Sequence, residues 1–94
     1  MDKILSLLGL SYRAGKLLLG ESVLDNMKDV KLLILASDAS EKTKERYAKK
    51  CAFYHIGCID RYDSGALSKA LGKRGIKAAG LTDEGFRDAI LKEL

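Results

Sequence analysis

Two patterns of apolar residues alternate along this chain of 94 residues. Stretches with an apolar residue every three or four positions predict amphipathic helices, and short, almost wholly apolar runs predict buried strands. The predicted helices span 1–14, 21–28, 41–53, 64–72 and 83–94, and the predicted strands span 17–19, 31–36, 55–60 and 76–81. Strands that alternate with helices indicate a single layered α/β domain, residues 1–94, with helices on both faces of a sheet.

The segment Lys31–Ala36 is the clearest strand, because it is apolar on both faces, as in a central strand covered by helices. Ser40 is a candidate N-cap for the charged helix that follows. The expected buried face of that helix is Tyr47, Ala48, Cys51 and Ala52. In the last helix a repeat of four predicts a stripe that packs on the core: Phe86, Ile90 and Leu94.

Composition narrows the class of protein. Hydrophobic residues make up 47% of the chain and Trp is absent, so a core of aliphatic side chains is expected. No apolar run reaches the length of a membrane span, and the start of the chain is too polar for a signal peptide. Cys51 and Cys58 occur without any sign of secretion, which predicts reduced thiols and a cytoplasmic protein. The net charge of +4 says little about a partner by itself, since the arrangement of the cations matters more.

Motifs for nucleotide and metal chemistry are incomplete. A phosphate-binding loop needs GxxxxGK followed by Ser or Thr. Leu17 follows Gly15-Lys16, which itself has the wrong spacing from Gly9, and Glu21 follows Gly20 where the Lys is required. Both candidate phosphate loops therefore fail.

A structural zinc site needs four ligands. Cys51, His55 and Cys58 lie close in the chain, but no second Cys pair or second His completes the set. Asp38 and Asp60 follow successive strands, where α/β active sites form, yet they are explained as well by helix capping and turns. We expect no metal, no cofactor and no catalytic residue.

Basic residues form two groups. Glu41 and Glu45 are interleaved with the cations of one helix, Lys42, Lys44, Arg46, Lys49 and Lys50, which predicts a solvated face with i,i+4 ion pairs. Lys73-Arg74, between Gly72 and Gly75, has no acidic neighbour. Such a loop can follow a phosphate backbone, or it can be a solubilising turn.

The order and spacing of several motifs resemble one family across nearly the whole chain. They are LLGLxYRAGK at 7–16, Gly20-Glu21, LILASDAS at 33–40, KKC before Tyr54, ALSKALGK at 66–73 and LTDEGF at 81–86. The chain resembles the bacterial YlxQ-type branch of the ribosomal protein L-seven-Ae and L-thirty-e family of kink-turn RNA binders. The resemblance implies a three-layer α/β/α sandwich around a four-stranded mixed sheet and a non-enzymatic role.

The resemblance also implies that three loops grip a kinked RNA internal loop: one at 20–23, one at 37–40 and one at 72–76. Helix N-termini suit phosphates, and polar side chains bind the exposed edges of non-Watson–Crick pairs. The residues expected to contact RNA are Arg13, Lys16, Gly20, Glu21, Ser22, Asn26, Lys28, Ser37, Asp38, Lys42, Gly72, Lys73, Arg74 and Gly75.

Ser22 and Val23 depart from the family pattern, which has Asn and Glu at these positions. The pattern also has a Lys where this chain has Asn26, and only Lys28 is close enough in the chain to take the place of that Lys. Val23 can neither donate nor accept a hydrogen bond, so one direct base contact is lost. We interpret the chain as a monomeric binding module for structured RNA, ribosomal or otherwise, with the ribosome as a candidate partner. The alternative is a protein-interaction module on the same fold that has lost kink-turn recognition.

Overall fold

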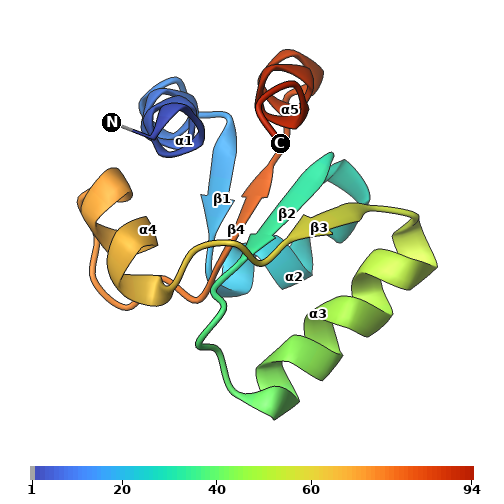
Figure 1. The fold of residues 1–94 in the computed structure, drawn as a ribbon. Helices are drawn as coiled ribbons and strands as arrows, with labels where there is room; N and C mark the ends of the chain where they lie inside the picture. Colours follow the sequence, from blue (N-terminus) through green and yellow to red (C-terminus); the bar gives the residue numbers. More distant parts are fainter. Residues whose placement is uncertain (1) are drawn as a thin grey trace.

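The four predicted strands form one mixed sheet in a computed structural model, which describes residues 2–94 (Figure 1). The strands lie in the order β1-β4-β2-β3. Their bounds are β1 Leu17–Leu19, β2 Leu32–Leu35, β3 Gly57–Ile59 and β4 Ala78–Leu81. Strand β4 is antiparallel to both β1 and β2, whereas β3 is parallel to β2. The predicted four-stranded mixed sheet is therefore confirmed.

Within residues 2–94, five α-helices and one 3₁₀ helix precede, connect and follow the strands. Their bounds are α1 Lys3–Arg13, α2 Glu21–Asp25, η1 Met27–Asp29, α3 Glu41–Tyr54, α4 Ser64–Leu71 and α5 Glu84–Leu91. Polar side chains cap the longer helices. Ser40 accepts a hydrogen bond from the Thr43 N–H, and Asp83 accepts one from the Phe86 N–H. Met1, where the first helix was predicted to begin, lies outside the described residues.

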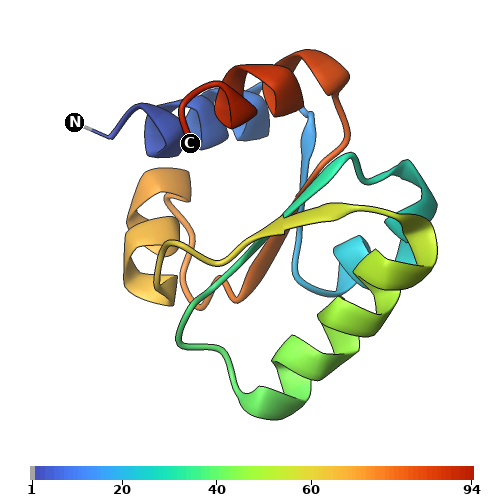
Figure 2. The same ribbon diagram turned by 45° about the vertical axis from the view of Figure 1, so that its right-hand side comes forward.

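Helices cover the sheet on both faces, as the predicted α/β/α sandwich requires. Helices α1, α4 and α5 lie on one side, and α2 and α3 lie on the other (Figures 1 and 2). Every residue of β2 and β4 is buried, which agrees with the apolar character of both central strands. The fully buried core side chains include Leu8, Leu33, Ile34, Leu67, Leu81 and Ile90.

Three sequence-based details were wrong. The helix predicted over 21–28 ends at Asp25, because Asn26 leaves helical geometry with φ −129° and the 3₁₀ helix η1 follows. Ala48 and Ala52 are exposed rather than buried, since Tyr47 and Cys51 define the side of α3 that faces the core. Helix α5 stops at Leu91, so Ile90 is buried while Leu94 is 61% exposed and does not extend the docking stripe.

Candidate functional site

Three loops meet at one end of the central strands. Because β4 runs antiparallel to β1 and β2, its first residue lies beside the last residues of both. Gly20, directly after β1, donates its N–H to the carbonyl of Ala78 at 3.1 Å. Ala36, directly after β2, donates its N–H to the carbonyl of Lys77 at 2.8 Å. We call the surface formed by residues 20–22, 37–40 and 72–77 the loop edge.

The first loop is held by its own backbone and side chains. Gly20 has φ +60° and ψ −134°, a conformation that favours glycine. The Ser22 hydroxyl donates to the carbonyl of Leu19 at 2.6 Å, and the Asn26 amide donates to the carbonyl of Ser22 at 2.9 Å. Ser22 therefore keeps free acceptor lone pairs on its hydroxyl, whereas Asn26 is engaged in closing the short helix.

Val23, one of the residues that depart from the family pattern, belongs to the core and not to the surface of this loop. Its side chain is fully buried. It packs over Gly80, where an added Cβ would lie 3.2 Å from Val23 Cγ1. A core position cannot present a polar group to a ligand, so this residue supports α2 from below instead of contacting a base.

The second loop is anchored by Asp38. One carboxylate oxygen accepts the N–H of Ser64 and the other accepts the Ser64 hydroxyl, both at 2.8 Å. These hydrogen bonds hold the pKa of the Asp38 carboxyl below its usual value, with a smaller effect from the charge of Lys77. Asp38 thus fixes the loop to the start of α4, while Ser37 is exposed.

The third loop presents two cations on a defined backbone. Gly72 caps α4 with φ +69°, and Gly75 has φ +67°. The N–H of Lys73 donates to the carbonyl of Ser68 at 3.1 Å, which ties the loop to the last turn of α4. Lys73 and Arg74 are exposed, and within residues 2–94 neither is in an ion pair.

Lys77 is a loop-edge cation that was not among the residues expected to contact RNA. It was counted as part of the strand predicted over 76–81, but β4 begins at Ala78, directly after Lys77, and the Lys77 side chain is exposed. Its carbonyl accepts the N–H of Ala36, and its charge acts on Asp38. In the sequence, the only indication of this role was a single cation between apolar Ile76 and the small residues that follow it.

Three of the predicted RNA contacts lie away from the loop edge. The carbonyl of Lys16 accepts the N–H of Thr82, which follows the last residue of β4, so Lys16 lies at the opposite end of the strands. Lys28 belongs to η1, on the connection that returns to the start of β2. Arg13 ends α1 and lines a groove of about 700 Å³ between α1 and α4, together with Leu5, Leu10 and Lys69. The structure does not bring these three cations together with the loops.

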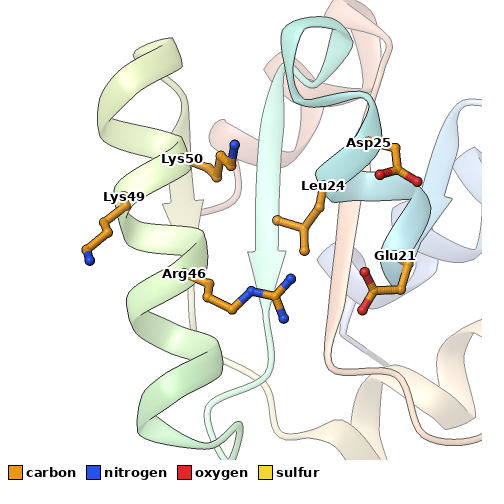
Figure 3. A pocket seen from close by; sticks show the side chains of 6 residues that line it. All are labelled: Glu21, Leu24, Asp25, Arg46, Lys49 and Lys50. Carbon is orange, nitrogen blue, oxygen red and sulfur yellow. The ribbon is translucent and has the colours of Figure 1, made fainter.

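A second groove runs between α2 and α3 beside the loop edge (Figure 3). It has a volume of about 400 Å³ and is lined by Glu21, Leu24, Asp25, Arg46, Lys49 and Lys50. The Tyr47 hydroxyl, from α3, donates to the carbonyl of Gly20 at 3.3 Å and so ties α3 to the residue before α2. Burial raises the pKa of Tyr47, and the Glu21 carboxylate adds to that rise.

The side chains considered as metal ligands are two free cysteines and a histidine that caps a helix. Cys51 is buried and Cys58 is exposed, and both are free thiols. The two thiols act on each other, which lowers the pKa of Cys51 and, together with burial, raises the pKa of Cys58. His55 is exposed and caps α3 with φ 57°. Among residues 2–94 no three metal-ligating side chains cluster, and none of the described helices is long and apolar enough to cross a membrane.

Known proteins similar to this chain carry names that concern RNA. No protein-family model matches it. It is 35% identical over 89 residues to the "RNA-binding protein YlxQ" of Enterococcus faecium, covering 90% of this chain and 84% of the relative. It is 31% identical over 91 residues to the "RNA-binding protein YlxQ" of Bacillus subtilis (strain 168), covering 94% and 91%.

Solved structures agree with the fold. A protein with unknown function from Bacillus halodurans C superposes with a TM-score of 0.87 at 36% identity, over 98% of this chain and 96% of the other. The 15.5kD RNA binding protein of Giardia lamblia superposes with a TM-score of 0.77 over 98% of this chain and 85% of the other. At 15% identity, this second likeness concerns the fold alone.

Proposed function

Since the chain belongs to the family of the RNA-binding protein YlxQ, we propose that it binds structured RNA, a kink-turn or a related internal loop, at the loop edge. The family also confirms the expectation of a non-enzymatic protein, because its named members are described by RNA binding. The single observation that carries the proposal is the meeting of three loops, distant in sequence, at one end of the strands.

Charge at the loop edge supports a phosphate backbone as the ligand. Lys73, Arg74 and Lys77 are exposed there and free of ion pairs in the part of the chain that the structure describes. The Asp38 carboxylate keeps its negative charge, because its hydrogen bonds with Ser64 lower its pKa, so these three cations stand against the carboxylates of Asp38 and Glu21. The cations therefore act on a backbone that passes over the loop edge, each adding salt-sensitive affinity.

In this proposal, small polar side chains of the loop edge contact the RNA bases. Ser37 and Ser22 expose hydroxyls at the loop edge, and the exposed Glu21 carboxylate can accept from a base amine. Buried Val23 replaces the polar residue of the family pattern, so we expect fewer base-specific contacts than the pattern provides. Specificity then depends more on the shape of the kinked backbone than on base identity.

Binding of a labelled kink-turn RNA, a plain duplex and a tRNA-like RNA over a range of salt concentrations tests the proposal. We expect preference for the kink-turn. Lys73→Ala with Arg74→Ala should lower the slope of log K against log[salt] by about 1.4–1.8 for two lost phosphate contacts. Lys92→Ala, an exposed cation at the end of α5, is the matched control and should change neither affinity nor slope.

Equal, weak binding to all three RNAs that vanishes at moderate salt would reduce the interaction to general cation attraction. RNA affinity that is unaffected by the paired substitution would favour the alternative of a protein-interaction module. We further propose a monomer that acts in the cytoplasm, with ribosomal RNA among the candidate ligands. Sedimentation of the purified protein tests the monomer, and sequencing of RNA cross-linked in cell lysate tests the ligand.

A further inference from the structure

Helix α3 separates its charges onto two faces. At 100° per residue, positions i, i+4, i+7 and i+11 form one stripe along a helix. One such stripe, with Lys50 beside it, contains Lys42, Arg46, Lys49 and Phe53. Another contains Glu41, Glu45, Ala48 and Ala52. Apart from Lys44, the intermixed charges of the sequence are thus separated, and we call the first group, Lys42, Arg46, Lys49, Lys50 and Phe53, the α3 cation face.

The predicted i,i+4 ion pairs do not neutralise this face. All of its members are exposed. The ion pairs found among residues 2–94 are Lys3 with Glu93 and Arg87 with Asp88, both outside α3. Unpaired cations in a row attract a polyanion more strongly than a face of alternating charges does.

The direction of the side chains shows which side of α3 remains open to a partner. Arg46 and Lys50 point toward α2 across the groove, whereas Lys49 points away from it (Figure 3). Glu21 and Asp25 occupy the opposite wall of that groove. These carboxylates disfavour an anionic strand on the floor of the groove. The stripe that such a strand can reach is therefore the outer one, Lys42, Lys49 and Phe53, with the charges of Arg46 and Lys50 on its groove side.

Phe53 is the last residue of this stripe, and its ring is largely exposed to solvent. It is 74% exposed, and no other exposed large apolar side chain in the described part reaches that value. Tyr54 meets it edge-on, with the ring centroids 4.9 Å apart and the planes at 78°. Aromatic rings placed beside cations bind unpaired nucleobases by stacking, and they do so with little preference for sequence.

We propose that the α3 cation face binds an unpaired RNA strand that leaves the structured RNA at the loop edge, with one base stacked on Phe53. This inference rests on the proposed function. Lys42 lies in the first turn of α3, two residues after Ser40 of the loop edge, so the α3 cation face begins where the second loop ends. The rise from Lys42 to Phe53 is about 16 Å. At roughly 3.4 Å per phosphate of a stacked strand, this length accommodates about five nucleotides.

Two RNAs that differ only in an unpaired tail test the inference. One is a blunt kink-turn RNA, and the other is the same RNA with six unpaired nucleotides on either the 5′ or the 3′ end, so that both polarities are tried. Phe53→Ala should weaken binding of one tailed RNA about tenfold, as expected for the loss of one stacked base, and leave the blunt RNA unchanged. Lys73→Ala with Arg74→Ala should weaken both RNAs. Leu91→Ala, 44% exposed on α5, is the apolar control and should affect neither.

Fluorescence gives an independent readout. The chain contains no Trp, so Phe53→Trp creates a single reporter. Its emission should be quenched by the tailed RNA at the concentrations that saturate binding, and not by the blunt RNA. The tailed RNA should also show a steeper salt dependence than the blunt RNA, by about 0.7 for each added phosphate contact.

The outcomes separate the two proposals. Wild-type protein that binds neither RNA refutes the loop-edge function and this inference with it. Wild-type protein that binds both RNAs equally, with Phe53→Ala neutral toward both tails, overturns the α3 strand site alone. A dimer that Phe53→Ala converts into a monomer, with RNA binding unchanged, would assign the exposed ring to a protein contact instead.

Discussion

Gly80 lies in β4 beneath α2, and replacing it with Ala tests whether the support of the loop edge is rigid. A Cβ at this position would lie 3.0 Å from Val30 Cγ2 and 3.2 Å from Val23 Cγ1. Both valines are β-branched and buried, with 3% and 0% exposure, so neither can turn aside without disturbing its neighbours. Gly80→Ala should therefore strain the packing of α2 on the sheet.

Two opposing effects determine the magnitude. Replacing a strand Gly by Ala contributes about 0.5–1 kcal/mol to stability by lowering the entropy of the unfolded chain. Overpacking of a tight core costs about 1–3 kcal/mol. Because the contacts are with stiff, buried methyl groups and not with the end of a flexible side chain, we expect overpacking to prevail. The net loss should be about 1 kcal/mol, which lowers the melting temperature of a domain of this size by about 4–8 °C.

Urea unfolding followed by far-UV circular dichroism measures this loss. The matched control is Gly57→Ala in β3, where a Cβ would meet only Leu32 Cδ1 at an ordinary 3.4 Å. That variant should be as stable as the wild type or more stable. Val30→Ala should cost less in the Gly80→Ala background than in the wild type, because it removes the clash. Gly80→Ala with an unchanged or higher urea midpoint would refute the reasoning.

Three further variants test the loop edge. Ser40→Ala removes the acceptor for the Thr43 N–H and should cost about 1 kcal/mol in urea unfolding, with no loss if α3 begins elsewhere. Asp38 has a lowered pKa in the folded state, so its contribution to stability is present above its ordinary pKa of 3.8 and is lost as the pH falls through the folded value. The melting temperature of the wild type should consequently fall more steeply below pH 4 than that of Asp38→Asn, and parallel curves would contradict the Ser64 contact. Lys77→Gln should reduce the salt slope of kink-turn binding by about 0.7–0.9, and an unchanged slope would remove this residue from the site.

Local patterns were sufficient for most of the elements of the fold. Leu17–Leu19 is a strand as predicted, and the segment predicted over 31–36 contains β2, because a run that is apolar on both faces can only be buried between layers of helices. Ser40 caps α3 because a hydroxyl at that position satisfies a backbone N–H that the helix leaves free. Helix ends were less certain, since capping and packing decide them together, as at Asn26 and Leu91.

The candidate site depended on tertiary structure. Strand order brings Gly20, Ala36 and Lys77 together, and no spacing in the sequence encodes that order. Asp38 resembled a ligand in the sequence, but its carboxylate is bound to Ser64, 26 residues away.

The charged helix shows the same division between sequence and structure. The heptad-like spacing of its cations and of Phe53 was present in the sequence, because a helix repeats every 3.6 residues. Which side faces the core was decided by Tyr47 and Cys51, whose burial left Ala48 and Ala52 in solvent. The sequence by itself thus determined the elements and their charges, and packing against the sheet determined which charges face one ligand together.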